Sequence, residues 1–141
     1  MVMVDSSVWI EAARRQGDLA TKVALRALLD EYEAAWCSPV RLEVLGGARA
    51  AERRPLETFF VCIPYVACVE PDWNAAKALA WRAREAGHTL PWNDFLISAT
   101  AAARGLRLYA RDVHFARLAD LGGARMYSPG YAGAFRADGE A

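Results

Sequence analysis

The stretch "VMVDSSVWI", residues 2–10, places a carboxylate at the end of an apolar run. The run predicts a short buried strand over residues 1–4, and the apolar spacing that follows predicts a helix over residues 7–15. A buried charge without a partner is costly. Asp5 must therefore lie at an edge of the fold, cap the helix that follows it, or bind a ligand.

The rest of the chain alternates short strands with helices. Strands are expected over residues 34–38, 106–110 and 124–128, and a short or edge strand within residues 61–70, where Pro64 interrupts an apolar run. Helices are expected between them, beginning near residues 18, 38, 52, 71, 90 and 113. This alternation is typical of an α/β domain on a mostly parallel sheet.

The composition is that of an ordinary globular protein. A chain of 141 residues is long enough for one full core, and its formal net charge of zero argues against a generally basic surface for nucleic acid. No apolar run approaches the roughly 18 residues of a membrane span. The amino-terminal residues lack the features of a signal peptide, so the expected location is the cytoplasm, without membrane association. Cys37, Cys62 and Cys68 are expected to be buried, reduced thiols.

The end of the chain differs in composition from the rest. Residues 1–128 are expected to form a single domain. From Pro129 onward the sequence is rich in Gly and Ala, so residues 129–141 are expected to form a loosely held tail.

Four carboxylates follow the expected strands or begin the expected helices. Asp5 ends the first strand, Asp112 follows the strand over 106–110, Glu43 lies one turn inside the helix after the second strand, and Asp94 lies in a first helical turn. Since ligands bind beyond the carboxyl ends of parallel strands, we expect the four to meet at one edge of the sheet. Such a cluster repels itself unless a cation is bound. Hard oxygen ligands suit Mg²⁺ or Mn²⁺, the ions that serve phosphodiester hydrolysis.

Each acid also has an ordinary structural explanation. Asp5 and Asp112 are good helix N-caps, Glu43 fits a solvated helix position, and Asp94 is favoured near a helix start by the helix dipole. The joint pattern is what favours a site.

Four stretches carry a resemblance to a known family. In order along the chain, "VDSSVWIE", "SPVRLEVL", "LPWNDFLISATA" and "LYARDVHFARL" together resemble the PIN domain, and especially the VapC-type toxins of bacterial toxin–antitoxin pairs. The resemblance implies a three-layer α/β/α sandwich with a mostly parallel sheet of about five strands. It also implies an endoribonuclease that needs Mg²⁺ or Mn²⁺. Metal binding is implied first for Asp5 and Asp94, with Glu43 and Asp112 completing an acidic quartet.

The resemblance also implies further features of the site and its partners. Ser6 matches a hydroxyl position that supports the metal site through a hydrogen bond. Ala110 departs from the pattern, because many relatives carry Thr or Ser two residues before the last aspartate, and this weakens the assignment of Asp112. The implied partners are an RNA substrate, a second copy in a homodimer, and a cognate antitoxin whose carboxyl-terminal segment lies in a groove.

Several other residues lie near the expected site in the sequence. Arg104, Arg107 and Arg111 surround the last two motifs and are candidates for RNA phosphate contacts, with solvated surface as the alternative. Trp92 is a candidate for base stacking, or for core or dimer packing. His114 is not needed as a general base beside four acids and metal-activated water.

Competing functions differ in the residues they require. A phosphoryl-accepting receiver domain needs a lysine after a late strand, and neither Lys22 nor Lys77 is so placed. A structure-specific DNA nuclease needs more chain than is present. A PIN-like scaffold that binds RNA or protein without cutting remains the alternative to the ribonuclease.

Overall fold

The computed structural model describes residues 1–140. Four strands and eight helical segments alternate along the chain within these residues. Their bounds are β1 (Val2–Val4), α1 (Ser6–Ala13), α2 (Leu19–Asp30), β2 (Ala34–Cys37), α3 (Ser38–Gly46), α4 (Ala50–Phe60), β3 (Tyr65–Val66), α5 (Glu70–Glu85), α6 (Trp92–Ala103), β4 (Arg107–Tyr109), α7 (His114–Asp120) and the 3₁₀ turn η1 (Tyr131–Gly133).

The strands form one parallel sheet in the order β3-β2-β1-β4. Val2 of the central strand β1 is in register with Ala34 on one side and with Arg107 on the other. All three residues of β1 are completely buried, as expected for a parallel strand covered on both faces. The α/β class with a mostly parallel sheet is therefore confirmed.

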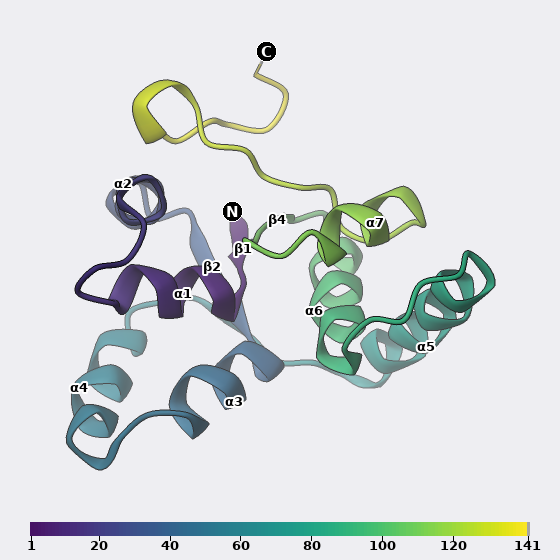
Figure 1. Ribbon diagram of the computed structural model, residues 1–141, viewed down its shortest axis with the longest axis horizontal. Helices are drawn as coiled ribbons and strands as arrows, with labels where there is room; N and C mark the ends of the chain where they lie inside the picture. Colours follow the sequence, from purple (N-terminus) through teal and green to yellow (C-terminus); the bar gives the residue numbers. More distant parts are fainter. Residues whose placement is uncertain (141) are drawn as a thin grey trace.

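Helices cover both faces of the sheet. Figure 1 shows the strands between one group that contains α1, α2 and α4 and another that contains α5, α6 and α7. Within the first group α1 contacts α2 and α3, and within the second α6 contacts α5 and α7. Helix α6 is buried from Asp94 to Ala101 and is the main central helix of its layer.

The helix boundaries follow the local sequence signals. The Asp18 carboxylate caps α2 by accepting a hydrogen bond from the Thr21 amide, and Pro39 lies in the first turn of α3. Gly87 and Gly105 follow α5 and α6 with φ values of +83° and +65°, where glycine avoids the strain that a side chain imposes.

The expectation of about five strands is wrong by one. Residues 124–128 run beside β4 but make only an isolated parallel bridge between Leu108 and Met126. Two hydrogen bonds hold it: the Leu108 amide to the Arg125 carbonyl and the Tyr127 amide to the Leu108 carbonyl, each 2.8 Å long. β4 itself is only three residues long, and Pro129 cannot extend a ladder, so the pairing does not grow into a strand.

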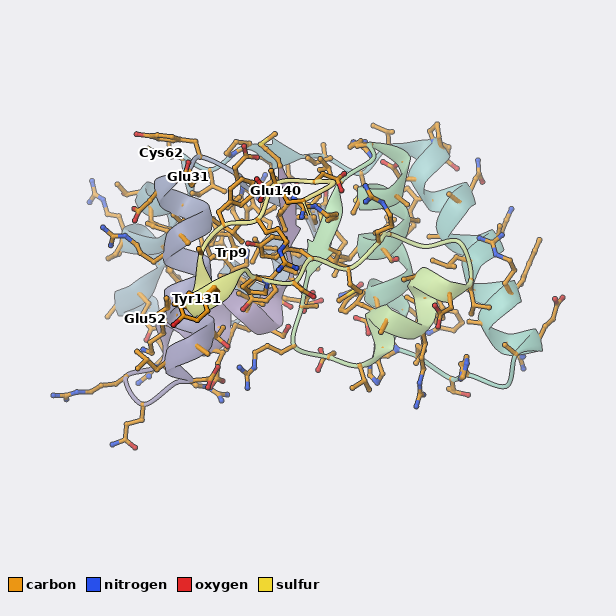
Figure 2. The ribbon with its side chains drawn as sticks, turned by 90° about the horizontal axis from the view of Figure 1, so that it is seen from above. Trp9, Glu31, Glu52, Cys62, Tyr131 and Glu140 are labelled. Carbon is orange, nitrogen blue, oxygen red and sulfur yellow. The ribbon has the colours of Figure 1, made fainter. Side chains whose placement is uncertain are left out.

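The segment after Pro129 has defined contacts. The turn η1 packs on α2, and Figure 2 shows Tyr131 over that part of the molecule. Phe135 stacks on Tyr127 with ring centres 6.4 Å apart, and Asp138 forms a two-pronged salt bridge with Arg125. The division into a domain over 1–128 and a tail over 129–141 stays a prediction.

The cysteines are free thiols, but only one is buried. Cys37 is buried at the end of β2, Cys68 is half-buried, and Cys62 is exposed, at the edge of the molecule seen in Figure 2. The expectation for Cys62 was wrong because α4 ends at Phe60, which leaves the following turn at the surface. Among residues 1–140, no helix combines the length and the apolar character needed to cross a membrane.

Candidate active site

Asp5 occupies the step from β1 to α1. Its Oδ2 accepts hydrogen bonds from the Ser7 amide at 3.0 Å and from the Ser7 hydroxyl at 2.6 Å, so Asp5 is the N-cap of α1. Only 2% of the residue is exposed. Burial raises the pKa of Asp5 to about 6 against the opposing effect of the Ser7 hydrogen bonds, and the charges of Glu43 and Asp94 raise it further. Asp5 is thus both a helix cap and a buried acid whose charged form is disfavoured.

Glu43 lies on α3 and is held from two sides. Its Oε2 accepts a short hydrogen bond from the Ser6 hydroxyl of α1. Its Oε1 accepts a hydrogen bond of 2.9 Å from the side-chain amide of Asn93 on α6. The carboxylate is therefore fixed between two helices that begin at the same edge of the sheet.

Asp94 lies in the first turn of α6 and contacts a histidine. Its Oδ2 is 3.0 Å from Nδ1 of His114, the first residue of α7. Burial raises the pKa of Asp94, the His114 contact opposes this, and the charges of Asp112 and Glu43 raise it further.

Three of the four acids lie around one depression, and the fourth is buried beside it. Glu43, Asp94 and Asp112 line a depression of about 430 Å³ together with Pro91, Trp92, Asn93 and His114. We call this the acidic depression. Asp5 does not line it, but is buried close enough for the charges of Glu43 and Asp94 to act on its carboxylate. Asp112 is exposed in the loop after β4. In the part of the chain described, no three His, Cys, Asp or Glu side chains are arranged to hold a metal ion directly.

The three candidate arginines are not gathered at the acidic depression. Arg104, at the opposite end of α6, forms a two-pronged salt bridge with Asp72. Arg107 is buried at the start of β4, with its guanidinium 5.0 Å from the centre of the Tyr127 ring. Arg111 follows β4, but its guanidinium donates hydrogen bonds to Asp18 and Thr21 at the start of α2.

Two residues of the site were missed by sequence reasoning. Asn93 holds Glu43 and His114 contacts Asp94, although no catalytic or supporting role was assigned to either. Their only sequence signal is nearness to the acids: Asn93 directly precedes Asp94 and His114 lies two residues after Asp112, which does not indicate what either side chain contacts. Trp92 is 78% exposed beside them, which excludes core packing.

A second, larger groove adjoins the acidic depression. It has a volume of about 770 Å³ and lies between α1, α3 and α4, with Trp9, Phe59 and Phe60 among its apolar residues. We call it the α1–α4 groove; Figure 2 labels Trp9 and Glu52, which line it. Arg14, Arg15 and Arg49 also line it. Glu43 lines both this groove and the acidic depression, so the two lie on either side of this residue.

Comparison with known proteins identifies the class. The PIN-domain family pattern matches residues 2–121, and the chain therefore belongs to the PIN-domain family. It is similar to two VapC ribonucleases, Mb1587 of Mycobacterium bovis and VapC11 of Mycobacterium tuberculosis. Each is 36% identical over 120 residues, which cover 82% of this chain and 89% of the relative. Ribonuclease VapC19 of M. tuberculosis is 31% identical over 123 residues, which cover 86% of this chain and 97% of the relative.

Solved structures share the fold. FitAcB from Neisseria gonorrhoeae matches with a TM-score of 0.76 and 19% identity, over 91% of this chain and 97% of the other. VapBC2 from Rickettsia felis, bound to a promoter DNA fragment, matches with a TM-score of 0.71 and 18% identity, over 90% and 98%. The implied fold is thus confirmed apart from the number of strands.

Proposed function

We propose that this chain is a Mg²⁺- or Mn²⁺-dependent endoribonuclease that hydrolyses RNA phosphodiester bonds, and that it is the toxin of a toxin–antitoxin pair in the cytoplasm. Its similarity to proteins named VapC ribonucleases supports the reaction class. The observation that carries the proposal is that Glu43, Asp94 and Asp112 line one depression, with Asp5 buried close enough for the charges of Glu43 and Asp94 to act on it.

The acids fit a divalent cation. Burial and mutual repulsion hold the pKa of both Asp5 and Asp94 above the ordinary value, and a bound cation relieves that repulsion. Asp5 and Asp94 would hold the ion. Mg²⁺ keeps several of its waters and is commonly held by only one or two carboxylates, so two protein ligands would be sufficient. When bound, the ion supplies an activated water and a Lewis acid for in-line hydrolysis.

The chain's own residues arrange the remainder of the site. Glu43, fixed by Ser6 and Asn93, presents its carboxylate to the acidic depression, where it can accept a hydrogen bond from water. His114 holds one oxygen of Asp94 and so orients this carboxylate in the first turn of α6. Asp112 adds negative charge at the exposed rim.

Cleavage of total RNA by the purified protein tests the proposal. We expect cleavage with Mg²⁺ or Mn²⁺, none with EDTA, and at least about a 100-fold loss for Asp5→Asn and Asp94→Asn without loss of the fold. Asp30→Asn is the matched control, because Asp30 is exposed on α2 and pairs only with nearby Arg26. Wild-type cleavage by either site variant would overturn the mechanism. RNA binding without cleavage in either metal would favour the scaffold alternative.

The α1–α4 groove suits an antitoxin segment. Its aromatic residues and its arginines fit a peptide that carries apolar and acidic residues, and because Glu43 lines both cavities, a basic side chain of that peptide could pair with the Glu43 carboxylate. We propose that a small protein encoded next to this chain binds there. Phe59→Asp should abolish co-purification of the two proteins, while Val61→Asp, at an exposed position beyond α4 that does not line the groove, should not.

We also propose a homodimer formed through α5 and α6. Trp73, Trp81 and Trp92 are all more than half exposed and line one cavity of about 530 Å³ on this face. Exposed aromatic patches of this kind mark association surfaces. Trp81→Glu should convert a dimer into a monomer in light scattering, and an unchanged mass would contradict this assignment.

A further inference from the structure

The loop that carries Asp112 has little packing of its own. It joins β4, which ends at Tyr109, to α7, which begins at His114. Arg111, Asp112 and Val113 are all exposed. Ala110, two residues before Asp112, has no hydrogen-bonding side chain. The position of the Asp112 carboxylate must therefore be set by contacts at the two ends of the loop.

The first end is tied to Asp5 through Ser7. The Arg111 amide donates a hydrogen bond of 3.1 Å to the Ser7 hydroxyl oxygen, and that hydroxyl donates its proton to Asp5 Oδ2 at 2.6 Å. The guanidinium of Arg111 adds hydrogen bonds to Thr21 at 2.5 Å and to Asp18 at 3.3 Å. One serine thus joins the loop to the most buried acid of the site.

The second end is tied to Asp94. His114 contacts Asp94 Oδ2 through Nδ1 at 3.0 Å. As Asp94 is the acceptor, Nδ1 is the donor in this contact. The two anchors are three residues apart and Asp112 lies between them, so both bear directly on its placement.

We propose that Ser7 and His114 are positioning residues that hold Asp112 over the acidic depression, by anchoring the two ends of its loop to Asp5 and Asp94. This inference rests on the proposed function only in that it treats Asp112 as an acid that takes part in RNA cleavage. The anchoring itself is a property of the loop and can be measured without any metal or RNA.

Amide hydrogen exchange of the metal-free protein, followed by NMR, tests the anchoring. Ser7→Ala removes the acceptor of the Arg111 amide, which should then exchange at least about 5-fold faster. His114→Ala should speed exchange at Val113 and His114 positions, while His114→Asn, which keeps a donor near the place of Nδ1, should restore it. Ser128→Ala and His88→Ala change residues outside the loop and should have no effect. Unchanged loop exchange in both Ser7→Ala and His114→Ala would overturn the proposal.

RNA cleavage then tests whether the anchoring matters for the reaction. We expect His114→Ala and Ser7→Ala each to lower kcat about 5- to 10-fold with little change in KM. His114→Asn should recover most of this loss, and His114→Gln, whose donor lies farther out, should not. A wild-type rate for Asp112→Ala would also overturn the proposal, because nothing catalytic would then be positioned. If the wild type cuts no RNA while the variants still loosen the loop, the proposed function fails and the anchoring stands.

Discussion

The side-chain amide of Asn93 donates a hydrogen bond of 2.9 Å to Oε1 of Glu43, although 50 positions separate the two residues in the sequence. Ser6 donates to the other carboxylate oxygen. Glu43 is therefore held by the first turns of both α1 and α6, each of which also carries or adjoins another acid of the site. The orientation of Glu43 depends on residues that have no charge of their own.

Removal of the Asn93 amide should slow RNA cleavage. A hydrogen bond to a charged group is worth about 1.5–3 kcal/mol, so Asn93→Ala should lower kcat by about 10-fold or more. Asn93→Asp should lower it further, because a second carboxylate would face Glu43. The melting temperature should change little, since Asn93 is exposed. Asn74→Ala, at an exposed position on α5, is the matched control. Wild-type cleavage by Asn93→Ala would show that Glu43 needs no such support.

Neutralising Asp5 should stabilise the metal-free protein at pH 7.5. The pKa of Asp5 is raised from 3.8 to about 6, so the folded state binds this proton more tightly than the unfolded state. Stability from this group therefore falls as pH rises from about 4 to about 6 and stays low above that. Asn keeps an acceptor for the Ser7 bonds, so Asp5→Asn should gain about 1–3 kcal/mol at pH 7.5 and nothing near pH 4.

Urea unfolding in EDTA at several pH values measures this gain. Exposed Asp30 provides the control, because Asp30→Asn should show no such gain. A less stable Asp5→Asn protein at pH 7.5 would mean that the cap, not the buried charge, dominates the energetics of this position.

Binding of a divalent metal ion should stabilise the folded wild-type protein. An ion that binds only the folded state at ten times its Kd raises stability by about 1.4 kcal/mol. We expect millimolar Mg²⁺ or Mn²⁺ to raise the melting temperature of the wild type and of Asp30→Asn by several degrees, and EDTA to reverse it. Asp94→Asn should lose most of this increase, since a carboxylate proposed to hold the ion is gone. An equal increase in wild type and Asp94→Asn would indicate that the ion binds elsewhere.

Much of the fold could be predicted because its signals are local. The buried strand before Asp5, the cap at Asp18 and the proline at position 39 depend on neighbouring residues, and each was correctly interpreted. The extra strand at 124–128 was wrongly predicted because strand pairing depends on the partner, and β4 offers only three residues.

For the candidate site, too, some features could be predicted from the sequence and others could not. Carboxylates that follow strands can be assigned to one sheet edge from topology alone: Asp5 follows β1 and Asp112 follows β4, the two strands that pair in parallel. The contacts of Asn93 and His114 depend on which helices meet in space, which the spacing of residues along the chain does not reveal. Arg104 shows that nearness in sequence can also mislead. It was expected near the site, but it lies at the opposite end of α6 from Asp94 and pairs with Asp72.

The Asp72–Arg104 salt bridge should stabilise the fold with the opposite pH dependence to Asp5. Asp72 is 2% exposed, and Arg104 holds it through bonds of 2.9 and 3.0 Å. The guanidinium lowers the pKa of Asp72 below the ordinary value of 3.8. Stability from this pair is thus fully present above about pH 4 and is lost as pH falls through the lowered pKa.

Arg104→Ala should therefore cost stability at neutral pH. Breaking a fully buried pair costs about 3–5 kcal/mol, and because the Arg104 side chain is 30% exposed we expect about 1–3 kcal/mol here. Arg104→Lys should recover only part of this, since an ammonium cannot make the two-pronged contact. Arg54→Ala, at an exposed position on α4, is the control. The difference in the free energy of unfolding by urea between wild type and Arg104→Ala should be largest near pH 7 and should become smaller below pH 4. If this difference in unfolding free energy stays constant down to pH 3, the stabilisation comes from packing of the arginine side chain rather than from its charge.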